Sequence, residues 1–316
     1  MKKYDVPLNI EDQISLMKKY VVFVKKVRMN RFLLYTGYFR ASRYGKFLLS
    51  YTSILGEKPK QDLLFNLYEF DVMLREVLMK YCKKAEIQFK SNLSNSISIK
   101  TGSSTFYLDE NYYTPSKGEN DKSKRNLNKK KYPKFIKDLK EKESKLRKNK
   151  LKYPELKEYR HGGTRSRYKI PSWAAFSYFD FGTIVMIYSY LKGDLRKEVL
   201  AYGYSKNRYD KAVTKEVDTW LDAIRNLRNV CAHNNILVGR TSSVVLFENI
   251  DTGLAGCKDT DLFSRLYALK KILKSEDIEL LKKDLNAIIK KSKIDIYLFN
   301  ILPRNWGELY DGINVL

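Results

Sequence analysis

Apolar residues recur at intervals of three and four along most of the chain, which is the spacing of an amphipathic helix. The clearest case is the stretch 61–90, QDLLFNLYEFDVMLREVLMKYCKKAEIQFK, in which Leu64, Leu67, Leu74 and Leu78 fall near one stripe. Charged residues occupy most of the remaining positions. The pattern therefore predicts a helix over 61–90 that buries this stripe in a core.

Further segments carry the same periodicity. It predicts helices over 10–29, 208–233, 259–273 and 275–291. The stretch 171–191, PSWAAFSYFDFGTIVMIYSYL, begins with a proline, which is favoured in the first turn of a helix, and then runs strongly apolar. We therefore expect it to form a central core helix, and we expect an all-α fold with at most minor β structure.

Two stretches depart from the helical pattern. Residues 91–120 are rich in Ser, Asn and Gly and predict a loop with at most one short strand. The stretch GRTSSVVLFENI at 239–250 could hold a second short strand. No tandem repeat and no linker-like boundary is visible. The simplest organisation is one helical domain over 1–316, with a polar and then lysine-rich insertion at 91–160.

Composition narrows the class of protein. A hydrophobic content of 43% and an aromatic content of 13% exclude global disorder. The N-terminus lacks the apolar core of a secretory signal, and the most apolar stretches are too short to span a membrane. The three cysteines are odd in number and show no CxxC spacing. We expect a cytosolic protein with no membrane partner, no structural metal and no cofactor.

Net charge points to an anionic partner. The chain has 61 Lys and Arg residues against 36 Asp and Glu residues, a formal charge of +25. Such an excess destabilises a compact state by self-repulsion unless a partner or salt offsets it, and nucleic acid is the usual partner. The alternative interpretation is a solvated, lysine-rich surface that reflects an AT-rich genome. Composition does not distinguish RNA from DNA.

The excess is concentrated at 117–160, which holds eighteen Lys and Arg residues against seven Asp and Glu residues. Its middle, 133–150, predicts a basic helix. Tyrosines interleave with the lysines, an arrangement that suits backbone attraction combined with base stacking. The tyrosines are Tyr132, Tyr153 and Tyr159, and the candidate RNA-binding lysines are Lys129, Lys130 and Lys131. The alternative is a flexible, solvated insertion.

The stretch 225–235, RNLRNVCAHNN, contains one of only two histidines in the chain. On a helical wheel, one face carries a stripe of apolar residues within about 40° of Trp220, and the opposite face carries a row of polar residues. The stripe comprises Trp220, Ile224, Leu227 and Cys231, and the row comprises Arg225, Asn229 and His233. Burial explains the stripe but not the row. Arg228 flanks the row at about 80°.

The residue types in this row suit a particular chemistry. Arginine presents a planar, permanently charged fork that matches phosphate oxygens. Histidine gives and takes a proton near neutral pH, and asparagine can orient an imidazole. Together, Arg228, Asn229 and His233 could cleave a phosphodiester without a metal. The alternative is an ordinary solvent-facing histidine on a helix.

The second histidine lies in the basic stretch RHGGTRSRY. His161 could act as a second proton donor, and a cluster of arginines around it could grip phosphate. These arginines are Arg160, Arg165 and Arg167. The alternative is a turn with a solvated histidine. No Walker motif, GxGxxG pattern or nucleophile elbow occurs in the chain.

The hexapeptide RNVCAH at 228–233 has the R-N-x3-H form and resembles the signature of HEPN-domain ribonucleases. Its flanks strengthen the resemblance. Four further stretches are similar to AbiD/AbiF-type abortive-infection proteins. They are the helix WLDAIRNL, the stretch PSWAAFSYFDFGTIVMIYSYL, the N-terminal LNIEDQISLMKKYVVFVKKVRMNRFLLYTGYFRASRYGKFL and the final PRNWGELY. The lysine-rich part of 91–160 departs from that family.

The resemblance implies an all-α HEPN fold with its catalytic half at 171–310, and a toxin-like ribonuclease that acts in the cytoplasm of bacteria in phage defence. HEPN nucleases assemble one site from two motifs, so a single motif implies a homodimer that pairs His233 with His233 of the second copy. Family members are associated with small structured RNAs. In this interpretation His233 transfers protons, Arg228 stabilises phosphate charge, Asn229 orients, and Arg225 docks the RNA.

Two other functions stay open from the sequence. The chain could be a non-catalytic RNA-binding dimer that captures a structured RNA with Arg228 and His233 as ligands. It could also be a structural helical adaptor whose charge is genomic bias. Salt-sensitive RNA binding distinguishes the adaptor from the other two.

Overall fold

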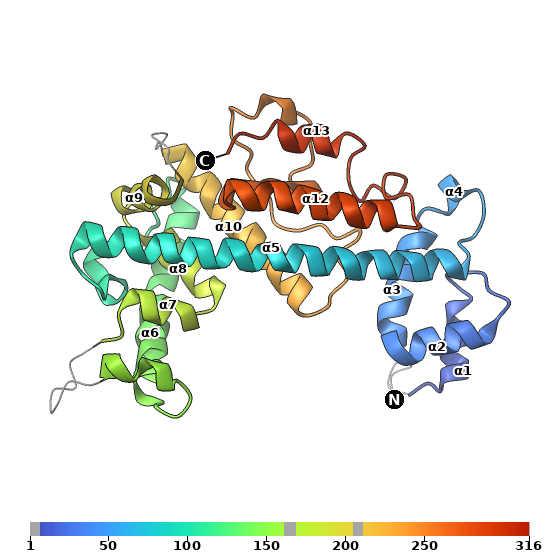
Figure 1. Cartoon of the computed structure of the whole chain (residues 1–316), viewed down its shortest axis with the longest axis horizontal. Coiled ribbons are helices and arrows are strands. Elements are labelled where there is room, and N and C mark those ends of the chain that lie inside the picture. The colour runs from blue at the N-terminus through green and yellow to red at the C-terminus, as the bar shows by residue number, and fades with distance from the viewer. Residues whose placement is uncertain (1–6, 161–168, 205–210, 316) are drawn as a thin grey trace.

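One very long helix organises the fold in the computed structural model of the chain (Figure 1). The structure describes residues 7–160, 169–204 and 211–315. Helix α5, Gln61–Thr101, has 41 residues and so spans about 60 Å. It ends at Gly102, whose φ of 65° is the left-handed conformation that commonly terminates helices.

The remaining helices form three groups around α5 (Figure 1). Near its N-terminal end lie α1 Ile10–Met17, α2 Lys26–Thr36, α3 Tyr38–Leu49 and α4 Thr52–Leu55. Toward its C-terminal end lie α6 Lys122–Lys148, α7 Ser172–Tyr178, α8 Phe181–Tyr190 and α9 Gly193–Tyr204. Along its length lie α10 Lys211–Ala232, α11 Leu262–Ile272, α12 Ser275–Lys291 and α13 Trp306–Asp311. Short 3-10 helices are η1 Phe106–Leu108, η2 Glu110–Tyr112, η3 Pro154–Arg160 and η4 Thr252–Leu254. Helices α3, α7, α8, α9, α10, α11 and α12 of the described residues all contact α5.

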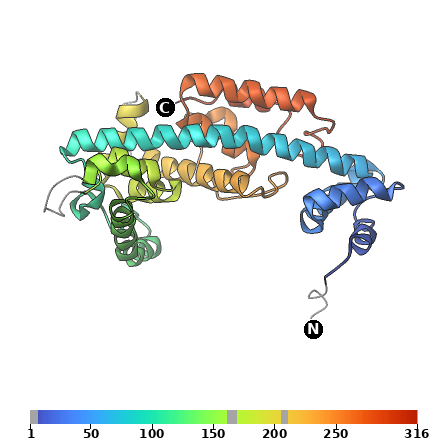
Figure 2. The ribbon, with the colours of Figure 1, turned by 60° about the horizontal axis from the view of Figure 1, so that its bottom comes forward.

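The all-α fold predicted from the sequence is confirmed. In the view of Figure 2, α10 and α12 lie on opposite sides of α5, so α5 is covered along much of its length. Within the described residues there is no strand, only isolated bridges between Val22 and Lys60 and between Tyr113 and Leu191. None of the described helices is both long and apolar enough to span a membrane.

The predicted loop at 91–120 is wrong over its first part, because α5 continues eleven residues beyond position 90. Phe89, Leu93 and Ile97 are all fully buried at four-residue spacing, so they extend the apolar stripe of the helix. Ser94 is also buried and shares a hydrogen bond of 2.8 Å with Ser172 at the start of α7. Tertiary packing therefore overrides the weak helix propensity of the Ser and Asn residues.

The short strand expected at 239–250 is also wrong. The loop backbone there makes two isolated bonds to the 259–260 backbone, from Ser242 and Val245, and otherwise bonds to side chains of neighbouring helices. The Trp220 indole N–H of α10 donates to the Leu246 carbonyl at 2.7 Å. The Tyr267 hydroxyl of α11 accepts from the Glu248 backbone N–H at 2.8 Å. These bonds satisfy polar backbone groups that a strand would pair within a sheet.

The single helix expected over 171–191 is in fact two. The break falls at Phe179 and Asp180, where the Asp180 carboxylate caps α8 by accepting from the Thr183 backbone N–H at 2.9 Å. The helix expected over 10–29 is likewise divided, into α1 and α2. Sequence periodicity continued across both breaks and did not show them.

The lysine-rich stretch forms helix α6, which projects away from α5 (Figures 1 and 2). It starts eleven residues before the predicted 133–150 and contains Pro133. One side packs on the core through Phe135, whose ring stacks on Tyr190 at 4.8 Å between centroids. The segment therefore forms a helix that packs on the core with one side and has a solvated basic face on the other.

Candidate active site

The R-N-x3-H motif lies at the C-terminal end of α10. Arg228 and Asn229 are in the last turns of the helix, and His233 follows Ala232 immediately. The His233 backbone N–H still donates to the Asn229 carbonyl at 3.0 Å, so the helical path continues to the histidine. The side chains of Asn229 and His233 are exposed. On the opposite face, the predicted stripe is buried: Trp220, Ile224, Leu227 and Cys231.

Arg228 is held by charge more than by hydrogen bonds. Its Nε lies 3.6 Å from Oε2 of Glu86 on α5, which is beyond hydrogen-bond distance. Among the described residues that Nε has no hydrogen-bond partner, and Nη1 makes only a long bond of 3.4 Å to Asn229. The other Glu86 oxygen accepts from Lys90 at 2.7 Å. The Arg228 side chain is one third exposed, so terminal N–H donors of its guanidinium are open to an incoming anion, whereas Nε is buried.

The chain turns sharply directly after the histidine. Asn234 adopts a φ of 52°, the left-handed region that asparagine tolerates better than most residues. The Asn235 backbone N–H donates to the Val230 carbonyl at 3.0 Å, which closes the helix end in the manner of a Schellman motif. His233 is therefore the last residue before the chain leaves the helical path.

Side chains of helix α5 fix this turn by hydrogen bonds. Arg75 Nη1 donates to the side-chain oxygen of Asn234 at 3.1 Å, and its Nε donates to Asp71 at 2.9 Å. Asp71 is fully buried, and its second oxygen accepts the backbone N–H groups of Leu237 and Val238 at 3.0 and 2.8 Å. The segment on the C-terminal side of the histidine is thus fixed to the core helix.

The Asp71 carboxylate has a further donor, the hydroxyl of Tyr44 on α3, at 2.6 Å. Burial, together with this carboxylate, raises the pKa of Tyr44 well above its usual range, so the hydroxyl stays protonated and donates. Four donors therefore satisfy one buried carboxylate, as burial of a charge requires.

Sequence reasoning missed Asp71, Arg75, Glu86 and Asn234. One signal was present, because Asp71 falls between Leu67 and Leu74 on the buried stripe of the 61–90 helix, where a charge is unexpected. Arg75 follows it by four residues. No local pattern connects either residue to a turn more than 150 positions later in the chain.

Arg225 lies two turns before the end of α10, and it lines a cavity of about 470 Å³ between α6, α8 and α10. Its guanidinium pairs with Asp222 at 2.5 Å. The cations that α6 contributes to this cavity are Lys131, Lys134 and Lys142. The structure thus brings Arg225 and Lys131 together. Lys129 and Lys130 are exposed on the same helix and do not line this cavity.

One carboxylate, that of Asp180, lines this cavity together with the lysines. Asp180 pairs with Lys142 and caps α8. Burial opposes ionisation of Asp180, but hydrogen bonds from Lys142 and Thr183 outweigh it and lower the pKa of Asp180 to about 2. The carboxylate is therefore ionised at neutral pH and neutralises one of the surrounding positive charges.

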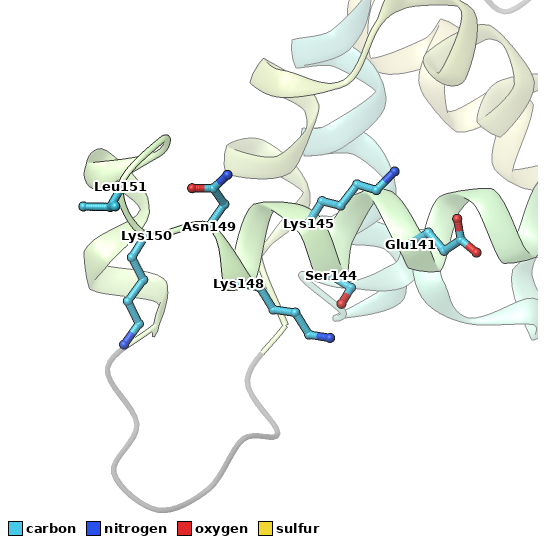
Figure 3. A pocket seen from close by; sticks show the side chains of 7 residues that line it. All are labelled: Glu141, Ser144, Lys145, Lys148, Asn149, Lys150 and Leu151. Atoms are coloured by element: carbon cyan, nitrogen blue, oxygen red, sulfur yellow. The ribbon is translucent and has the colours of Figure 1, made fainter.

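A second basic hollow, of about 650 Å³, lies at the C-terminal end of α6 (Figure 3). Three lysines from α6 and the turn after it line it: Lys145, Lys148 and Lys150. Figure 3 shows their side chains extending in different directions, without converging on one point. This geometry suits diffuse attraction to a polyanion better than a specific small-molecule site.

One predicted stacking residue lies in the core, and other predicted binding residues lie outside the part of the chain that the structure describes. Tyr132 is buried against Tyr190, at 5.4 Å between ring centroids, so it is a core residue and the base-stacking interpretation is wrong for it. Tyr153 packs on Tyr178. His161, Arg165 and Arg167 lie outside the described residues, and of Arg160 only its place as the last residue of η3 is described.

The cysteine of the motif is not a nucleophile at neutral pH. Cys231 is buried, and burial raises its pKa to about 12, so the thiol stays protonated. Cys82 on α5 is fully buried, and burial raises its pKa too. In the part of the chain that the structure describes, no three His, Cys, Asp or Glu side chains gather as a metal site would require.

These features define an all-α protein that presents an Arg-Asn-His set at the end of an amphipathic helix, braced by a buried ion pair. The family model described as Abi-like protein matches residues 31–238, about two thirds of the chain, and this range includes the motif. The chain therefore belongs to this abortive-infection family. No curated protein and no solved structure matches it significantly.

Proposed function

We propose that the protein is a metal-independent endoribonuclease of the HEPN type that acts in bacterial abortive infection, with its catalytic half at 171–310. The observation that carries the proposal is the arrangement at the end of α10. Arg228 and His233 are solvent-accessible there, and the segment that follows them is fixed to α5 by Arg75. An exposed acid-base group on a rigid support is what phosphodiester cleavage needs.

The reaction would be a transesterification within the RNA strand. The 2′-oxygen attacks the adjacent phosphorus as its proton leaves, and the 5′-oxygen of the next nucleotide departs as it gains a proton. The products are a 2′,3′-cyclic phosphate and a 5′-hydroxyl. His233 transfers one of these protons, and Arg228 stabilises the charge that develops on the phosphate oxygens. Asn229 orients the imidazole or the phosphate.

Two protons move in this reaction, but each chain supplies one motif histidine. A homodimer that brings two α10 ends together would provide one histidine as base and one as acid. The accessibility of Asn229 and His233 supports such pairing, because a second copy can reach them. The composite site is thus the proposed form of the enzyme.

The proposed substrate or partner is RNA, including a structured small RNA. Support comes from the net charge of +25 and from the basic face of α6, which carries Lys129, Lys130 and Lys131. Arg225 stands about 12 Å before His233 along α10, a separation of three or four nucleotides at roughly 3.4 Å each. An RNA strand that reaches His233 can therefore contact Arg225 as well. A toxin-like action on cellular RNA in the bacterial cytoplasm would follow.

Incubation of the purified protein with a structured RNA in EDTA tests the proposal. We expect cleavage that leaves 2′,3′-cyclic phosphate ends, and none on DNA of the same sequence, because DNA lacks the 2′-hydroxyl. Cleavage that requires added metal, or that cuts DNA equally, contradicts it. Tight, salt-sensitive RNA binding without any cleavage favours the RNA-capturing dimer instead.

A further inference from the structure

A groove between α5 and α7 plays no part in the proposed chemistry. Its volume is about 340 Å³, enough for one nucleobase. The α5 side provides Ile87, Lys90, Ser91, Ser94 and Asn95, and the α7 side provides Trp173, Phe176 and Ser177. We propose that this groove binds one unpaired base of the RNA strand, with the indole of Trp173 as its stacking surface.

The exposure of Trp173 is the first argument. The chain has three tryptophans, and two of them, Trp220 and Trp306, are buried in the core. Trp173 is 49% exposed, and Ile87 across the groove is 68% exposed. A large ring left half in water beside a hollow has surface free for contact, and an aromatic face stacks on any base.

The polar lining is the second argument. Ser91, Asn95 and Ser177 carry donors and acceptors that suit the edge of a base. Asn95 makes only a long bond of 3.4 Å to Ser91, so its amide can exchange that bond for one to a ligand. A purely apolar contact surface would not have this lining. A base has both a stacking face and a hydrogen-bonding edge, and the groove offers a counterpart to each.

Connection to the motif is the third argument. Lys90, in the groove wall, pairs with Glu86 at 2.7 Å, and the other oxygen of Glu86 lies 3.6 Å from Arg228. The groove spans Ile87 to Asn95, so it starts one residue beyond Glu86 and extends about 12 Å along α5. That distance corresponds to roughly one to four nucleotides from a phosphate at Arg228. The groove would therefore select the base near the cleaved bond.

This inference rests on the proposed function for its substrate, but its test does not depend on cleavage. The probe is an eight-nucleotide 2′-O-methyl RNA, which lacks the attacking hydroxyl, and a matched octamer with abasic positions carries the same charge. We expect the first to quench the exposed tryptophan emission and the abasic one not to. Quenching without cleavage on ordinary RNA would contradict the ribonuclease and leave the groove proposal standing.

Variants sharpen the test. Labelled octamer binding, followed by fluorescence anisotropy, should weaken about tenfold in Trp173→Leu and only slightly in Trp173→Phe, which keeps a ring. The matched control is Tyr202→Leu, because Tyr202 is an aromatic residue 52% exposed on α9. Equal affinity of Trp173→Leu and wild type, or dissociation of a dimer in Trp173→Leu by light scattering, overturns the proposal.

Discussion

Arg75, in the N-terminal half of the long helix α5, donates a hydrogen bond of 3.1 Å to the side chain of Asn234, the residue directly after His233. The same guanidinium pairs with the buried carboxylate of Asp71. The turn that ends the motif is thereby attached to the most extensively packed helix of the protein. Arg75 is a positioning residue in this account, because it acts through Asn234 and contacts no substrate.

Substitution of Arg75 should lower the stability of the fold. Arg75→Met leaves the Asp71 carboxylate buried without its ion-pair partner, and we expect a loss of about 3 kcal/mol in the free energy of unfolding. The matched control is Arg28→Met, since Arg28 pairs with Asp62 at the surface and should contribute less than about 1 kcal/mol. Urea denaturation of each variant measures the difference. Equal effects would show that the buried pair is not a structural support.

The left-handed turn at Asn234 gives a gentler perturbation. Asn234→Gly should fold with stability within about 1 kcal/mol of wild type, because glycine adopts a positive φ without strain. It removes the bond from Arg75, so the cleavage rate should fall while RNA affinity stays nearly constant. Steady-state kinetics should show this as a lower kcat at unchanged KM. A pure loss of affinity would contradict the positioning role.

Removal of the acidic neighbour of Arg228 should strengthen RNA binding. Glu86→Gln keeps the size of the side chain and removes the negative charge that lies 3.6 Å from Arg228. We expect several-fold tighter RNA binding at low salt, because more of the guanidinium field then reaches the phosphate. The control is Glu76→Gln, an exposed glutamate on the same helix with the same charge change. Equal tightening in both variants would indicate a general charge effect.

The basic face of α6 makes a prediction about salt dependence. Replacement of Lys129, Lys130 and Lys131 by alanine should lower the slope of log affinity against log salt by about 2, at roughly 0.7 for each phosphate contact on a single strand. Lys290, Lys291 and Lys293 are exposed near the end of α12 and form a matched triple control. RNA-binding titrations at several salt concentrations measure both slopes. If the slope falls by the same amount in both triple variants, the RNA does not bind the basic face of α6.

The loss of stability on acidification should depend in part on Asp180. Its pKa of about 2 in the folded state lies below the usual value for aspartate, so its contribution to stability is present near neutral pH. That contribution is lost as the pH falls from about 4 toward 2. Because the side chain is 55% exposed, we expect only about 1 kcal/mol. Asp180→Ala should therefore be less stable than wild type at pH 7, and the gap should narrow at pH 2.5.

The parts of this fold that follow local periodicity could be predicted from the sequence. The buried stripe of α10 is one of them, because Trp220, Ile224, Leu227 and Cys231 recur at helical spacing. The extension of α5 past position 90 was not predicted, since Ser and Asn residues concealed the continuing stripe of Leu93 and Ile97.

The candidate site, too, could be predicted from the sequence only in part. Arg228, Asn229 and His233 follow from a short motif and a helical wheel. Their support does not, because Arg75 and Asp71 meet Asn234 and Val238 only through the tertiary fold. Such contacts between distant residues leave no local pattern, and only the oddity of a charge on a buried stripe indicated them.

The role of His233 is measured by the rates at which wild type and His233→Ala cleave one end-labelled RNA in EDTA. The two proteins must first match in circular dichroism and in oligomeric state, so that misfolding cannot mimic a catalytic defect. We predict cleavage by wild type and a loss of at least a hundredfold in the variant, within the range that acid-base catalysis supplies. Equal rates for the two proteins would contradict the assignment of His233 as the group that transfers the proton.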